Sequence, residues 1–156
     1  MKRHLWAKNL IGWLIRVYYR ISWKNIDSIP DDERLWRSVY NSSQVKPDGS
    51  IKPGFFKNKD GLSTDLSKFS TVEKSRRGRA KPPWPASAGL VEFKVMDLKE
   101  VSAGQTNVAH DPIRTTQVKN YSHTISLPGL STAQAKEMLG RYKFLVKPSI
   151  PQDIKG

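Results

Sequence analysis

A basic, proline-rich stretch in the middle of the chain constrains the fold more than any other feature of the sequence. Residues 74–81 read KSRRGRAK and hold five Lys and Arg, and the next four residues, PPWP, add three prolines and a tryptophan. A buried cationic side chain needs its own partner, and proline interrupts helices and central strands. The sequence therefore predicts an exposed loop at residues 72–88.

The segments on the two sides of this loop together predict one globular domain over residues 27–147. Only 37% of the 156 residues are hydrophobic, which is below the usual share, so part of the chain is expected outside the core. We predict a basic amphipathic helix over residues 1–26 and a short tail over residues 148–156. No internal repeat is visible in the sequence at the period of a repeat protein.

The apolar pattern predicts an α+β fold with a small, mostly antiparallel sheet and one or two packed helices. Residues 90–95 and 121–127 alternate in the manner of strands, and residues 142–147 suit a last strand. Residues 62–66 follow an Asp-Gly turn and predict a further strand. The run at residues 35–40 follows an acidic cluster, as helices often do, but it is equally typical of a strand.

Capping and turn residues mark several element ends. Ser131 and Gln134 have the spacing of a capping box and predict a helix over residues 132–139 that Gly140 ends. Asp97-Leu98-Lys99-Glu100 has the same spacing and predicts a single helical turn. Pro47-Asp48-Gly49 predicts a tight turn inside a short hairpin, because proline presets φ and glycine tolerates a positive φ.

The N-terminal segment has an apolar and a basic face. The apolar face holds Trp6, Leu10, Trp13, Leu14, Val17 and Ile21, and the other face holds Lys8, Asn9, Arg16 and Arg20. Charged residues interrupt each apolar run well short of a membrane span, and no small-residue cleavage site follows. Three alternatives remain: residues 6–21 pack on the domain or a protein partner, lie on an anionic membrane, or contact phosphates through Arg16 and Arg20.

Charge gives the strongest indication of a partner. The chain carries 27 Lys and Arg against 14 Asp and Glu, a net charge of +13, which favours a polyanionic partner. The absence of cysteine excludes a disulfide scaffold and a thiolate zinc site and fits a reducing, cytoplasmic compartment. The leading interpretation is a non-enzymatic accessory protein that binds RNA or DNA as a subunit of a larger assembly. The predicted phosphate and base contacts are Arg76, Arg77, Arg79, Lys81 and Trp84.

An enzyme that acts on nucleic acid or NAD is the alternative. His110 and His123 can serve as acid and base in phosphodiester cleavage, and Asp111 can orient a histidine. Lys119 or Arg114 would then stabilise the charge of the transition state. The sequence predicts no metal site and no cofactor, because it has no carboxylate cluster with ligand spacing, no phosphate-binding loop and no dinucleotide fingerprint.

Two resemblances add to this interpretation. Arg37 in L-W-R, followed later by Ser63-Thr64, resembles the ADP-ribosyltransferase folds, and the resemblance implies that these residues help to hold NAD. The catalytic glutamate that it also implies has no clear counterpart, since Glu137 falls in a predicted helix.

The second resemblance covers a longer part of the chain. The motifs L-W-R-S-V-Y, D-G-S-I, L-S-T-D, H-D-P and N-Y-S-H, spread over residues 34–127, resemble a group of small uncharacterised bacterial proteins. This second resemblance implies a bacterial or phage-related origin and no particular activity.

Overall fold

The computed structural model describes residue 14 and residues 25–77, 87–115 and 119–149. Within these ranges, no helix has the length and apolar character that crossing a membrane would require. Leu14 is helical and its side chain is half exposed. The rest of the predicted N-terminal helix up to residue 24, together with Arg79, Lys81 and Trp84, lies outside the described residues.

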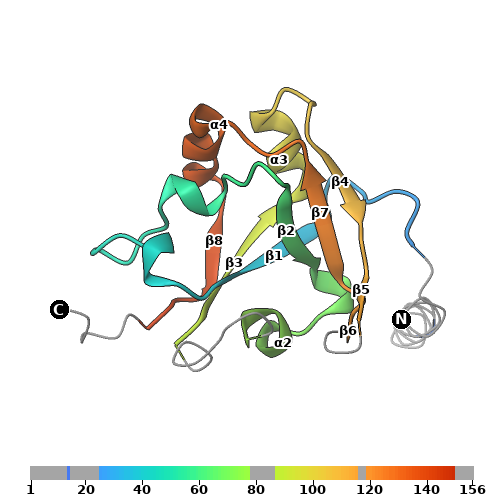
Figure 1. Ribbon diagram of the computed structural model, residues 1–156, viewed down its shortest axis with the longest axis horizontal. Helices are drawn as coiled ribbons and strands as arrows, with labels where there is room; N and C mark the ends of the chain where they lie inside the picture. Colours follow the sequence, from blue (N-terminus) through green and yellow to red (C-terminus); the bar gives the residue numbers. More distant parts are fainter. Residues whose placement is uncertain (1–13, 15–24, 78–86, 116–118, 150–156) are drawn as a thin grey trace, which may run out of the picture.

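A six-stranded antiparallel sheet forms the centre of the domain, which makes the fold α+β with a mostly antiparallel sheet, as predicted (Figure 1). Its strands are β1 (Arg34–Val39), β2 (Leu62–Leu66), β3 (Gly89–Lys94), β4 (Asn107–His110), β7 (His123–Leu127) and β8 (Lys143–Val146). They are ordered β4-β7-β2-β1-β3-β8, so strands from both sides of the central basic stretch pair with one another. A separate two-stranded ribbon pairs β5 (Ile113–Arg114) with β6 (Lys119–Asn120).

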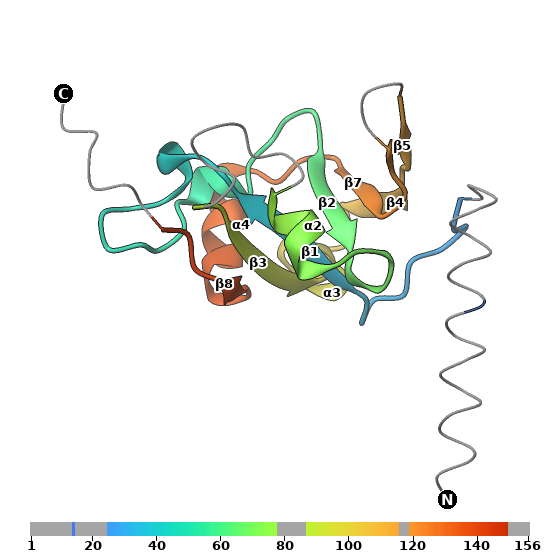
Figure 2. The same ribbon diagram turned by 90° about the horizontal axis from the view of Figure 1, so that it is seen from below.

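Helices cover both faces of the sheet. In Figure 1, α3 (Val95–Val101) and α4 (Thr132–Glu137) lie above the sheet, and α2 (Val72–Arg77) lies below it, in front of β1 when seen from below in Figure 2. The hydrophobic core lies on the α3 and α4 side. Its fully buried side chains include Leu35, Phe56, Leu62, Leu66, Val91, Leu98 and Met138.

Short 3-10 helices complete the connections: η1 (Ser42–Gln44), η2 (Pro53–Phe55), η3 (Ser67–Phe69) and η4 (Met138–Gly140). The predicted tight turn is confirmed, since Gly49 has a φ of 82° and Val45 forms an isolated antiparallel bridge with Ile51. The capping box at Ser131 is also confirmed, because its side chain accepts a hydrogen bond from the backbone N–H of Gln134.

The acidic cluster before residue 35 does not start a helix. Residues 34–39 form the central strand β1, whose six residues all pair with β3. The carbonyls of Asp31 and Glu33 instead accept hydrogen bonds from the N–H groups of Met96 and Val95, at the start of α3. That helix begins two residues earlier than the predicted turn at Asp97, because the residues before β1 already accept hydrogen bonds from its first two N–H groups.

The predicted loop at residues 72–88 is wrong for its first six residues, which form α2. The backbone carbonyl of Arg76 accepts a hydrogen bond from Ser38 Oγ of β1, and the Arg76 guanidinium donates to the carbonyl of Ala88. The Arg76 side chain is only 18% exposed. Contact with the polar face of the sheet therefore outweighs the local tendency of this basic segment to stay in solvent.

Candidate functional site

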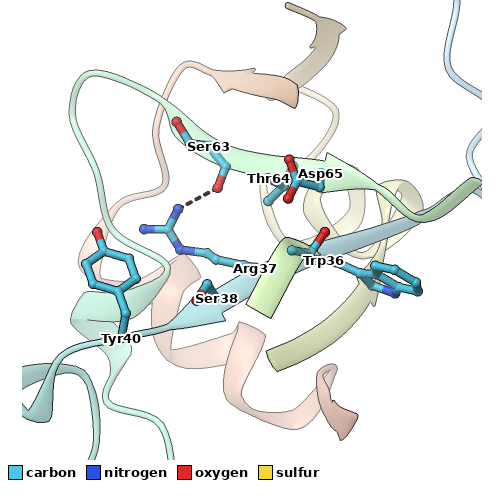
Figure 3. A pocket seen from close by; sticks show the side chains of 8 residues that line it. Trp36, Arg37, Ser38, Tyr40, Ser63, Thr64 and Asp65 are labelled. Carbon is cyan, nitrogen blue, oxygen red and sulfur yellow. Dashed lines mark hydrogen bonds between the residues drawn. The ribbon is translucent and has the colours of Figure 1, made fainter. Parts of the chain in front are cut away.

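The two central strands β1 and β2 part from each other near their middle. Their ladder consists of two residue pairs, Leu35 with Leu66 and Trp36 with Asp65. Beyond Trp36 the strands diverge and a narrow pocket opens between them. It is lined by Trp36, Arg37, Ser38, Tyr40, Ser63, Thr64, Asp65 and Ser75 (Figure 3). The pocket volume of about 10 Å³ is close to the least that can hold one water molecule.

Arg37 bridges the gap between the strands. Its Nη1 donates a hydrogen bond to the carbonyl of Ser63 at 2.6 Å, and its guanidinium carbon lies 4.9 Å from the centre of the Phe55 ring. Figure 3 shows the guanidinium directed at Ser63, whereas the Trp36 ring points away from it. Arg37 and Ser63, which are 26 positions apart in the sequence, are therefore in direct contact.

Polar side chains line the β2 side of the gap. Asp65, which is 9% exposed, accepts a hydrogen bond from Asn120 Nδ2 at 2.7 Å. Asn120 Oδ1 in turn accepts one from Ser122 Oγ at 2.6 Å. The Asp65 carboxylate is thus held in a fixed position by the turn that leads into β7.

His123 lies on the same face of the sheet, opposite Asp65 in the register of β2 and β7. Its Nε2 is 3.2 Å from Ser63 Oγ, and its Nδ1 is 2.6 Å from the carbonyl oxygen of Asp111. The carboxylate of Asp111 lies 3.3 Å from the same Nδ1. Ser63, His123 and Asp111 therefore form one continuous chain of polar contacts across β2, β7 and the end of β4.

His110 does not join this site. It pairs with Thr124 in the register of β4 and β7, and neighbouring residues of a strand point to opposite faces, so the His110 ring lies on the other side of the sheet from His123. Its Nδ1 accepts a hydrogen bond from the N–H of Ile26 at 3.1 Å, and its Nε2 is 2.6 Å from the carbonyl of Tyr121. Burial lowers the pKa of His110 below its usual value. The expected pairing of the two histidines is therefore absent.

The other predicted site residues are dispersed. Arg76 is held by Glu73 and by the carbonyl of Ala88, and Arg77 is the last residue of α2. Arg114 and Lys119 face each other across the β5–β6 ribbon. The remaining candidates, Arg16, Arg20, Arg79, Lys81 and Trp84, lie outside the described residues.

Sequence reasoning missed Asp65 and Asn120, although both stand in short motifs that the sequence makes visible, L-S-T-D and N-Y-S-H. Within the described part of the chain, no group of three or more His, Asp or Glu residues is arranged to hold a metal ion. Glu137, the carboxylate considered for the ADP-ribosyltransferase resemblance, is an exposed residue of α4.

Comparison with known proteins gives no relative: the chain matches no protein-family model, no curated protein and no solved structure.

Proposed function

We propose that the protein is an enzyme of the ADP-ribosyltransferase type, which binds NAD as a substrate where β1 and β2 part. The observation that carries the proposal is the contact between Arg37 Nη1 and the Ser63 carbonyl at 2.6 Å. These are two of the residues on which the resemblance rests, and no local pattern in the sequence requires them to meet. Their contact in a polar pocket of the sheet supports a common task.

The residue types suit a dinucleotide. NAD carries a diphosphate, and a guanidinium recognises phosphate oxygens through paired N–H donors. Hydroxyl, amide and carboxylate groups suit the hydroxyls of a ribose. Ser63 and Asp65 supply a hydroxyl and a carboxylate at the pocket, and Asn120 supplies an amide that donates to Asp65. Because the pocket itself is about 10 Å³ in volume, we propose that it receives only one edge of the ligand and that the remainder lies across its rim.

His123 and Asp65 would take the place of the missing glutamate. Transfer breaks the bond between nicotinamide and ribose and requires a group that accepts the proton of the incoming hydroxyl. His123 and Asp65 are buried on the same face as the Ser63 side chain, so either can reach a ribose held beside Ser63. Glu137 belongs to α4 and is not among the residues that line the pocket.

Calorimetric titration with NAD tests the proposal, with release of nicotinamide as a second readout. We expect Arg37→Ala to weaken NAD binding by about 10- to 150-fold, which corresponds to the loss of a hydrogen bond to a charged group worth about 1.5–3 kcal/mol. Arg34→Ala is the matched control, because Arg34 is an arginine of the same strand with a 59% exposed side chain. Wild-type protein that neither binds NAD nor releases nicotinamide would contradict the proposal.

A nucleic-acid partner is a second proposal, which the charge distribution favours. The described residues carry 18 Lys and Arg against 13 Asp and Glu, whereas the other residues carry 9 against 1. Most of the net charge of +13 thus belongs to segments outside the described residues, above all residues 1–24. Such basic segments suit phosphate contacts that do not depend on base sequence.

A further inference from the structure

Ser63, His123 and Asp111 lie next to one another in the order of a nucleophile, a base and a group that orients the base. Ser63 Oγ lies 3.2 Å from His123 Nε2, within reach of a hydrogen bond. On the other side of the ring, the carbonyl and the carboxylate of Asp111 both lie next to Nδ1, at 2.6 and 3.3 Å. A serine hydroxyl that donates to a histidine held in this way is the arrangement that activates serine for nucleophilic attack.

The partners of His123 determine which ring nitrogen carries the proton. A carbonyl oxygen can only accept a hydrogen bond, so the contact with the Asp111 carbonyl requires a proton on His123 Nδ1. In the neutral imidazole, Nε2 then has a free electron pair, and this electron pair faces the hydroxyl of Ser63. This is the tautomer that a general base needs in order to take the proton of the serine.

The geometry is held by rigid elements. Ser63 belongs to β2 and His123 to β7, and the two strands are neighbours with four paired residues. The His123 side chain is 5% exposed, so the base is shielded from water, whereas Ser63 is partly exposed and lines the pocket. An electrophile would therefore approach Ser63 Oγ from the partly exposed side of Ser63 and leave the buried His123 in place.

His110 provides an internal comparison. It is equally buried and both of its ring nitrogens have partners, but these partners are the backbone N–H of Ile26 and the backbone carbonyl of Tyr121. Such contacts hold a histidine in place and activate no hydroxyl. Of these two buried histidines, only His123 contacts a side-chain nucleophile.

We propose that Ser63 is a nucleophile activated by His123 and that it forms covalent adducts with acyl or phosphoryl electrophiles. In the reaction with a fluorophosphonate, Ser63 Oγ attacks phosphorus, an O–P bond forms, the P–F bond breaks and fluoride leaves. The proton of the hydroxyl passes to His123 Nε2. This inference goes beyond the proposed binding of NAD and does not depend on it, because a reactive serine requires no nucleotide.

Labelling of the full-length protein with a fluorophosphonate, followed by intact-mass measurement and peptide mapping, tests the inference. We expect one adduct per chain, located on Ser63, and no adduct in Ser63→Ala. His123→Gln should slow the labelling by at least about 100-fold, the lower range for the loss of a general base. His110→Gln is the matched control, a second buried histidine on the opposite face, and should label within a few-fold of the wild-type rate.

A wild-type protein that is not labelled, or that is labelled at other serines, would overturn the inference. So would a His123→Gln variant that reacts at the wild-type rate. If His123→Gln does not fold, the wild-type protein is labelled in its native state and in urea, and equal rates at Ser63 would also overturn the inference. Because none of these readouts involves NAD, failure here is distinct from failure of the proposed function.

Discussion

Replacing His110 tests whether this histidine is a structural residue. The His110→Ala variant loses the hydrogen bonds to Ile26 N–H and to the Tyr121 carbonyl, and each buried group that loses its partner costs about 1–3 kcal/mol. It also loses ring contacts with Phe69 and Tyr121, whose centres lie 6.1 and 4.7 Å away, worth about 0.5–1.5 kcal/mol. We therefore expect the free energy of unfolding to fall by about 2.5–7.5 kcal/mol.

Urea denaturation of the wild type and of His110→Ala, followed by tryptophan fluorescence, measures this loss. A decrease of less than about 0.5 kcal/mol, the range of an ordinary surface substitution, would refute the structural assignment of His110. The pH dependence of the free energy of unfolding provides a second test of this assignment. Burial lowers the pKa of His110 below its usual 6.5, so the unfolded chain binds a proton there at a higher pH than the folded protein does.

The direction of the pH effect on stability follows from this difference in pKa between the two states. At pH values above 6.5 His110 is neutral in both states, and as the pH falls below 6.5 the unfolded state gains the proton first. The wild type should therefore lose stability on acidification with a contribution from His110 of at most about 1.4 kcal/mol per pH unit. This contribution should be missing in His110→Ala. Equal slopes for the two proteins would show that the pKa of His110 does not differ between the folded and the unfolded state.

Two further predictions concern the close approach of Gly129 to the backbone of Asn58 and the charge of residues 1–24. Gly129→Ala should destabilise the protein by more than about 1 kcal/mol, because an added Cβ would lie 1.8 Å from the carbonyl oxygen of Asn58. Gly140→Ala, where no atom lies within 4 Å of the added Cβ, should be neutral or stabilising by up to about 1 kcal/mol; equal melting temperatures of the Gly129→Ala and Gly140→Ala variants would contradict this contrast. Deleting residues 1–24 removes six Lys and Arg and should flatten the salt dependence of binding to generic duplex DNA, each lost phosphate contact reducing the slope by about 0.9. An unchanged slope would mean that the segment makes no phosphate contacts.

Local chemistry determined several elements without reference to the rest of the fold. The capping box of Ser131 and Gln134 placed the start of α4 correctly, because the side chains bond to their own helix N-terminus. The turn at Gly49 was equally predictable from the need for a positive φ. Alternating polarity predicted β3 to within one residue and β7 to within two, since the side chains of a strand point to its two faces in turn.

Tertiary contacts decided the elements whose local pattern was ambiguous. Residues 34–39 became a strand because both neighbours, β2 and β3, pair with them. Residues 72–77 became a helix although their charge favours solvent, because Ser38 and Ala88 provide partners for Arg76. These partners lie 38 and 12 positions away from Arg76, so no short window of the sequence contains the information.

In the candidate site, too, the sequence determined some features and the tertiary structure decided others. The sequence by itself singled out Arg37, Ser63 and both histidines as residue types with chemistry. Only the sheet decided which of them meet: the divergence of β1 and β2 brings Arg37 to Ser63, and the register of β2 and β7 brings His123 to the same serine. His110 lies on the opposite face, because strand alternation and register depend on pairing between distant segments rather than on the local sequence.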